Sequence, residues 1–110
     1  MTFYQRIVVF VTAPRDKAGE LSRRLVEEKL AACVNIVNNL DSIYWWEGKV
    51  ENDSESLLIL KTELGLLGKL VKRIKMLHPY EVPEIIALPI IGGNPDYLKW
   101  ISDSIGQEEV

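Results

Sequence analysis

Apolar residues follow two spacings along this chain, and each spacing predicts a different kind of element. Short runs rich in Val, Ile and Leu, at residues 7–11, 33–37, 57–62 and 84–91, are typical of buried strands. Between and after these runs the apolar residues recur every three or four positions, which indicates amphipathic helices within residues 16–30, 62–79 and 97–101. The predicted order is strand, helix, a pair of strands, helix, strand and a short final helix.

Capping and helix-breaking residues place the ends of these elements. Asp16 is expected to cap the first helix, which should run to about residues 29–30. The second helix should stop at His78, because Pro79 disfavours helical geometry in the residue before it. Pro89 cannot donate a ladder hydrogen bond, so we predict a sheet edge or a bulge at that position.

The middle of the chain predicts one long β-hairpin. Residues 33–37 and 42–46 supply its first arm, Glu47 and Gly48 the turn, and residues 57–62 the second arm. The complete order is then βαββαβ with an added C-terminal helix, an α+β ferredoxin-like fold with helices on one face of an antiparallel sheet. A length of 110 residues without a break in composition fits one domain, so we assign residues 1–110 to a single domain.

Both faces of the predicted sheet carry apolar side chains. Successive strand residues point to opposite faces, so Val8 and Phe10 oppose Val9 and Val11. Two helices cover only one face, and the other would present a larger apolar patch than monomers usually tolerate. We expect another copy of the chain to cover it. The alternative is that the C-terminal helix, with Trp100, folds under the sheet and hides this face alone.

Composition narrows the possible partners and locations. Thirteen Lys and Arg against sixteen Asp and Glu give a net charge of −3, which argues against a nucleic-acid binder. A single cysteine cannot form an intrachain disulfide, the first residues lack a secretory pattern, and no apolar run approaches the ~20 residues of a membrane span. We therefore expect a soluble cytoplasmic protein without nucleic-acid or membrane partners.

The segment from His78 to Glu84 holds the only histidine, an aromatic residue and two carboxylates around two prolines. His78 can ligate a transition metal, Cys33 can add a thiolate if the fold brings it near, and Glu84 offers oxygen. One histidine and one cysteine cannot complete a closed four-ligand site, so metal binding would be open, shared between chains or weak. The alternative is that His78 caps the helix and Cys33 is simply buried.

Enzymatic chemistry is not predicted. Nucleophilic catalysis by Cys33 would need a neighbouring base and a third group that orients the base. The chain offers only His78 as that base, and the sequence gives no reason to place it beside the thiol. We therefore assign no catalytic residues.

Aromatic residues form a second group of candidates. Tyr44, Trp46 and Tyr80 combine ring surface with polar atoms and can line a ligand cleft. Lys61, at the end of the third strand, can meet an anionic ligand or pair with a carboxylate such as Glu84. The alternatives are interface packing for the rings and an ordinary surface position for the lysine.

Several motifs together resemble the CutA divalent-cation tolerance proteins. They are Leu-Ala-Ala-Cys-Val-Asn at 30–35, Tyr-Trp-Trp-Glu-Gly-Lys at 44–49, Leu-Lys-Thr at 60–62, His-Pro-Tyr-Glu-Val-Pro-Glu at 78–84 and Tyr-Leu-Lys-Trp at 97–100. The resemblance covers nearly the whole chain in order. It implies a ferredoxin-like subunit in a tight homotrimer similar to PII signalling proteins, with hairpins that pair across subunits, and a cytoplasmic role in tolerance of copper and other divalent cations.

The family's metal residues transfer only in part. Some members carry a cysteine just before Thr-Ala-Pro and a second histidine just before His-Pro-Tyr, and these positions are Val11 and Leu77 here. A copper site of that composition cannot form in this chain. Of the family's metal ligands the resemblance leaves only His78, and Cys33 and Glu84 are the candidate ligands that could replace the missing ones.

Three functions remain open at this stage. The first is a non-enzymatic homotrimer that binds copper or another divalent cation weakly through His78, Cys33 and Glu84. The second is a PII-like signalling or small-ligand module whose intersubunit clefts are lined by Tyr44, Trp46, Lys61 and Tyr80. The third is a structural trimer that presents a surface to a partner protein.

Overall fold

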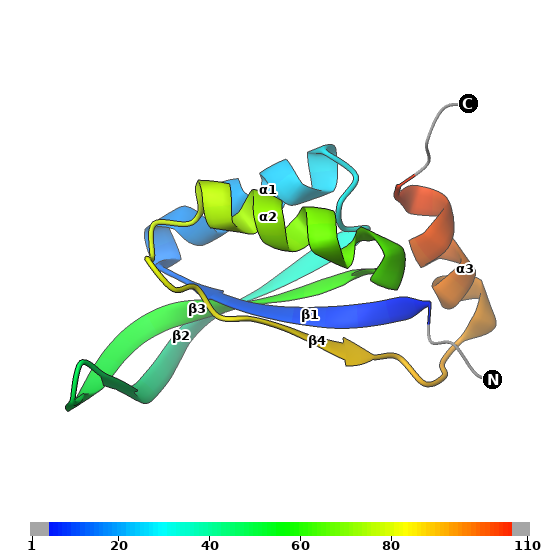
Figure 1. Ribbon diagram of the computed structural model, residues 1–110. Coiled ribbons are helices and arrows are strands. Elements are labelled where there is room, and N and C mark those ends of the chain that lie inside the picture. Colours follow the sequence, from blue (N-terminus) through cyan, green and yellow to red (C-terminus); the bar gives the residue numbers. More distant parts are fainter. Residues whose placement is uncertain (1–4, 107–110) are drawn as a thin grey trace.

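The computed structural model describes residues 5–106 and has the predicted order of elements (Figure 1). A strand and a helix come first, β1 (Arg6–Ala13) and α1 (Arg15–Glu27). The hairpin β2 (Cys33–Trp46) and β3 (Lys49–Glu63) follows, then a 3-10 turn (Leu64–Leu66) and α2 (Leu67–Leu77). The chain closes with β4 (Ile85–Pro89) and α3 (Pro95–Ser104). The βαββαβ order with an added helix is confirmed.

The strands form one antiparallel sheet of four strands in the order β2-β3-β1-β4. Helices α1 and α2 lie together on one face of this sheet, and α3 lies at one end (Figure 1). This is the α+β, ferredoxin-like architecture that the sequence predicts. Pro89 belongs to β4, which is an edge strand, so the predicted edge position is also correct.

The core lies between the sheet and the two helices that cover it. Alternate residues of β1, among them Val9 and Val11, are fully buried and face the helices. Leu25 of α1 and Leu70 and Ile74 of α2 are also fully buried there. Burying each such side chain contributes about 1.5 to 3 kcal/mol, so this layer fixes the helices against the sheet.

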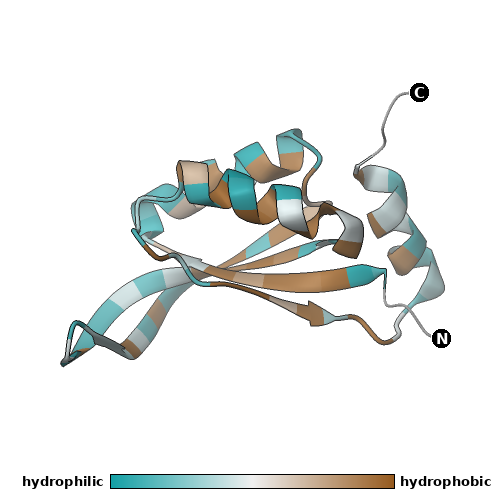
Figure 2. Cartoon of the chain, viewed as in Figure 1, coloured by the Kyte–Doolittle hydropathy of each residue, from teal (hydrophilic) through white to brown (hydrophobic). Residues whose placement is uncertain are grey.

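The hairpin is longer and more continuous than the sequence suggests. Strands β2 and β3 pair from Cys33 with Lys61 to Trp46 with Lys49, with one irregularity between Val37 and Leu40. The half of the hairpin that includes the turn extends beyond the helices. Figure 2 shows that the β3 strand is largely hydrophilic in this half. The hairpin therefore carries aromatic and acidic side chains away from the core.

Three local expectations are corrected by the structure. Asp16 does not cap α1: the N-cap position is Pro14, no side chain caps it, and Asp16 lies in the first turn, where its charge still favours the helix dipole. Helix α1 ends at Glu27, because Lys29 takes a left-handed φ of 61° that terminates the helix. Strand β4 covers residues 85–89 rather than 84–91.

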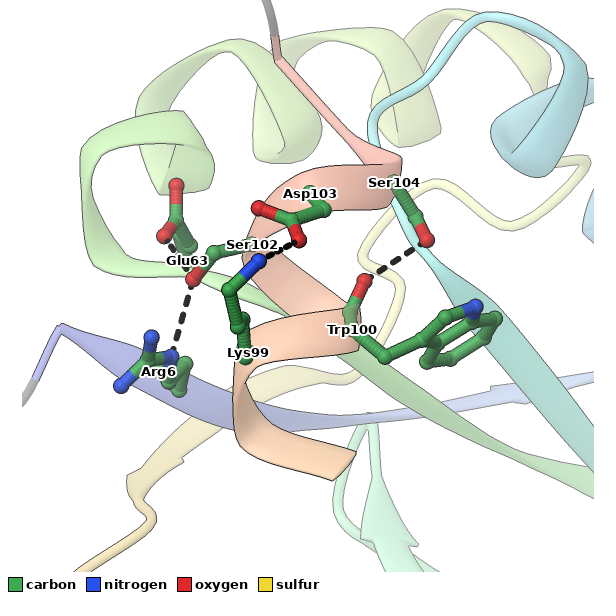
Figure 3. Close-up of polar contacts among 7 residues, drawn as sticks. All are labelled: Arg6, Glu63, Lys99, Trp100, Ser102, Asp103 and Ser104. Carbon is green, nitrogen blue, oxygen red and sulfur yellow. Dashed lines mark hydrogen bonds and ion pairs between the residues drawn. The ribbon is translucent and has the colours of Figure 1, made fainter. Parts of the chain in front are cut away.

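The C-terminal helix covers only one end of the sheet. Ser102 accepts a hydrogen bond from Arg6 Nε at 2.9 Å and donates one to Glu63 Oε2 at 2.5 Å, which ties α3 to the start of β1 and the end of β3 (Figure 3). Farther along the sheet, Ile86 and Leu88 of β4 remain 51% and 45% exposed. The helix does not hide the second face of the sheet alone.

Candidate functional site

A cavity of about 680 Å³ lies between the outer half of the hairpin and the loop that joins α2 to β4. Its wall includes side chains from β1, β2, β3 and this loop: Thr12, Ser42, Ile43, Tyr44, Trp45, Trp46, Asp53, Glu55, Tyr80, Glu81, Val82 and Glu84. The pairing of β2 with β3 determines the aromatic and acidic part, because it sets residues 42–46 against residues 49–53. The cavity therefore combines ring surfaces with four carboxylates.

Two tyrosine–carboxylate pairs organise this cavity. The Tyr44 hydroxyl on β2 donates to Asp53 Oδ2 on β3. The Tyr80 hydroxyl donates to Glu55 Oε1 at 3.0 Å, and Glu55 is only 6% exposed. Each bond holds an aromatic ring at a fixed orientation against the cavity wall.

The carboxylates also keep both hydroxyl groups protonated. The hydrogen bond to Asp53 raises the pKa of Tyr44 to about 12. Burial raises the pKa of Tyr80, and the hydrogen bond to Glu55 adds to the effect. Both hydroxyls therefore remain protonated donors even at alkaline pH.

The loop that carries Tyr80 is held in place by His78. His78 ends α2, where its backbone N–H donates to Ile74 O at 2.8 Å. Its ring atom Nε2 lies 2.7 Å from Thr12 O, and its Nδ1 accepts the backbone N–H of Tyr80 at 3.1 Å. A carbonyl can only accept, so Nε2 carries the proton and the ring is neutral. The ring thus caps a carbonyl of β1 rather than those of its own helix.

The structure does not bring the three predicted metal ligands together within one chain. Across the sheet, Cys33 of β2 pairs with Lys61 of β3, and Lys61 pairs with Val8 of β1. His78 instead bonds to Thr12, which lies four residues beyond Val8 on β1. Four strand residues span about 13 Å. Glu84 lines the cavity.

No group of three or more His, Cys, Asp or Glu in residues 5–106 is placed to hold a metal ion. The metal site of His78, Cys33 and Glu84 therefore stays a prediction.

The predicted ligand-cleft residues separate into two places. Tyr44, Trp46 and Tyr80 line one cavity. Lys61 lies elsewhere, where its Nζ donates to Asn35 Oδ1, the same atom that accepts from Cys33 Sγ at 3.7 Å. The ring surfaces are thus grouped as the sequence suggests, and the lysine is not among the residues that line the cavity.

Sequence reasoning missed Asp53 and Glu55. They belong to the acidic series Glu51, Asp53 and Glu55, which has the spacing of two that places side chains on one face of a strand. The predicted second arm begins at residue 57, so it leaves out residues 49–56. Glu and Asp have low strand propensity, so this alternation does not stand out as part of a strand.

Comparison with known proteins identifies the family. Residues 7–104 match the family model described as CutA1 divalent ion tolerance protein. The chain belongs to this family. CutA 1 from Oryza sativa, named as chloroplastic, is 56% identical over 99 residues, which is 89% of this chain and 56% of that protein. The divalent-cation tolerance protein CutA from Thermus thermophilus is 52% identical over 100 residues, 90% of this chain and 97% of that protein.

Solved CutA1 structures share the fold. The crystal structure of CutA1 from Oryza sativa superposes with a TM-score of 0.90 at 51% identity and covers 98% of this chain and 100% of that one. The chain spans about half the length of the plant relatives that it matches. Because these plant CutA proteins are named as chloroplastic, the cytoplasmic location stays a prediction. Within the described residues, no helix is both long and apolar enough to cross a membrane.

Proposed function

We propose that this protein contributes to tolerance of divalent cations by binding them weakly, with copper as one of the ions bound. The observation that carries the proposal is the cavity with four carboxylates, among them Glu84, in a chain that belongs to the divalent ion tolerance family. Carboxylate oxygens accept divalent cations, and copper stands near the top of the divalent affinity order. The role is binding, and no catalytic group is assigned.

Low affinity is expected from the positions of the candidate ligands. His78 can offer Nδ1 to a metal only if Tyr80 N–H gives up its bond to that nitrogen. Cys33 lies on another part of the sheet, so its thiolate would serve a site shared with a neighbouring chain or a separate weak one. Glu84 would then supply the oxygen ligand at the cavity.

We propose that the protein acts as a homotrimer. The support is the open face of the sheet, where Val8 and Phe10 of β1 lie beside the exposed Leu88 and Ile86 of β4. Apolar side chains this close together favour contact with another copy of the chain. The number three comes from the resemblance to PII-like trimers, and light scattering at low concentration should give three times the mass of the chain.

Isothermal titration of Cu²⁺ into metal-free protein tests the metal role. We expect saturable binding that is reduced in Glu84→Gln and in His78→Ala and unchanged in Glu20→Gln, which removes an equal charge from α1. Equal binding in all four proteins would reject these ligands, and no binding in any of them would reject the metal role.

A second candidate function is a PII-like module that binds a small ligand. The observation that favours it is the volume of the cavity, about 680 Å³, which lies in the range of small-molecule sites of roughly 300 to 1,000 Å³. A signalling role would also require a ligand-dependent change of conformation. Stabilisation by a small molecule but by no metal ion would favour this function.

A further inference from the structure

We propose that the cavity between the hairpin and the loop 79–84 binds an organic ammonium cation. The carboxylates would hold the charge, and the aromatic rings would hold the substituents around it. This inference goes beyond the tolerance of divalent metal ions and does not depend on it.

The decisive residue is Glu55. Its side chain lines the cavity, yet the residue is only 6% exposed. Within residues 5–106 no ion pair reaches this carboxylate, and the one hydrogen bond it accepts comes from the neutral hydroxyl of Tyr80. A carboxylate removed from water is costly unless a cation compensates it. The cavity therefore favours a ligand that carries a positive charge.

The remaining lining residues strengthen this preference. Asp53, Glu81 and Glu84 add three carboxylates, and no Lys, Arg or His of the described chain is among the residues that line the cavity. An anionic ligand would meet like charges from β3 and from the loop. A cation is attracted by all of them, most strongly where water is excluded.

The shape of the site favours a large cation over a metal ion. No group of three or more acidic, His or Cys side chains in residues 5–106 is placed to hold a metal ion, which agrees with the weak metal binding proposed above. The volume of about 680 Å³ also exceeds what an ion with its ligands would fill. A cation whose charge is spread over several carbon atoms can contact separated carboxylates without a tight coordination shell.

The aromatic wall provides the second kind of contact. Tyr44, Trp46 and Tyr80 are 38%, 40% and 37% exposed, so each ring has a buried part and an accessible part. The bonds from Tyr44 to Asp53 and from Tyr80 to Glu55 fix the two tyrosine rings before a ligand arrives. Ring faces attract ammonium groups and are used in this way to bind quaternary ammonium ligands.

Titration of benzyltrimethylammonium into the assembled protein tests the proposal, with calorimetry and tryptophan fluorescence as readouts. Benzyl alcohol and benzoate provide a neutral and an anionic probe of similar size. We expect saturable binding of the cation alone, weakened about tenfold or more by Glu55→Gln, since one lost charge interaction of this kind changes affinity by an order of magnitude. Glu20→Gln, an exposed carboxylate on α1, is the matched control and should bind as the unchanged protein does.

Further outcomes separate this proposal from the others. Asp53→Asn serves as a second variant if Glu55→Gln unfolds, and each variant is compared by thermal melting and mass. Three outcomes would overturn the proposal. The cation and benzyl alcohol could bind equally, or Glu55→Gln and Glu20→Gln could lose the same amount of affinity. The cation could also fail to bind because a neighbouring copy fills the cavity. A Cu²⁺ titration of the same samples tests the metal role separately, because either ion can bind without the other.

Discussion

The imidazole of His78 joins two parts of the chain that are 66 residues apart. Nε2 donates to Thr12 O on β1, and Nδ1 accepts from Tyr80 N on the loop beside the cavity. The ring also packs on the Tyr80 ring with 4.7 Å between centroids. One buried side chain therefore fixes the loop that brings Tyr80 to Glu55.

Loss of the His78 ring should destabilise the fold. In His78→Ala the buried carbonyl of Thr12 loses its partner, which costs about 1 to 3 kcal/mol, and the part-buried N–H of Tyr80 loses its partner as well. We expect a lower urea midpoint in His78→Ala and partial recovery in His78→Gln, whose amide can donate and accept. Equal midpoints for the variant and the unchanged protein would show that the ring does not stabilise the loop.

At the scale of elements, the hairpin turn determines the face of the hairpin on which each aromatic residue lies. Glu47 and Gly48 both have positive φ, 49° and 80°, as a two-residue turn that matches the twist of the strands requires. The turn fixes the pairing of Trp46 with Lys49 and, through it, of Tyr44 with Glu51. A slip of one residue would move every side chain to the other face and dismantle the Tyr44–Asp53 pair.

Alanine at two glycines should have opposite effects on stability. Gly48→Ala places a side chain at a φ of 80°, which costs about 1 to 2 kcal/mol, although no atom lies within 4 Å of the new carbon. Gly19→Ala lies within α1, also has open space, and should stabilise the helix by about 0.5 to 1 kcal/mol. Thermal melting compares the two, and a Gly48→Ala protein that melts at or above the temperature of the unchanged protein would reject the role of the turn.

At the scale of the whole molecule, the single chain leaves two sheet edges and a large apolar surface uncovered. Strands β2 and β4 are the two edges of the sheet. Exposed apolar residues lie on the open face of β4 and along the hairpin, where Ile43 is 69% and Trp45 is 74% exposed. Together these features favour assembly through the open face and the hairpin.

A charge on the open face should break assembly and leave the chain folded. Ile86 is 51% exposed in the single chain, so Ile86→Glu costs little before assembly, but a buried unpaired carboxylate would oppose contact with another copy. Val26→Glu, on α1 at 38% exposure, is the matched control. We expect light scattering to give a smaller mass for Ile86→Glu alone, and an unchanged mass would exclude this face from the interface.

The accuracy of the sequence predictions follows from the range of the interactions involved. Periodicity identified the strands and helices of the core, because Val9 or Leu70 is buried by a pattern that repeats locally. The cap at Asp16 was wrong because the backbone at Pro14 already starts the helix. Glu55 was missed because its hydrogen-bond partner Tyr80 lies 25 residues away in sequence.

The sequence by itself determined the order of elements, the antiparallel α+β sheet, the helix stop at His78 and the two apolar faces of the strands. These depend on local spacing, on proline geometry and on the alternation of strand side chains. Only the tertiary structure decided which polar groups meet. It pairs Tyr80 with Glu55 and Thr12 with His78, and it keeps Cys33 and Lys61 apart from the cavity. The physical reason is that strand register and loop packing position side chains distant in sequence, and neither is encoded in any short segment.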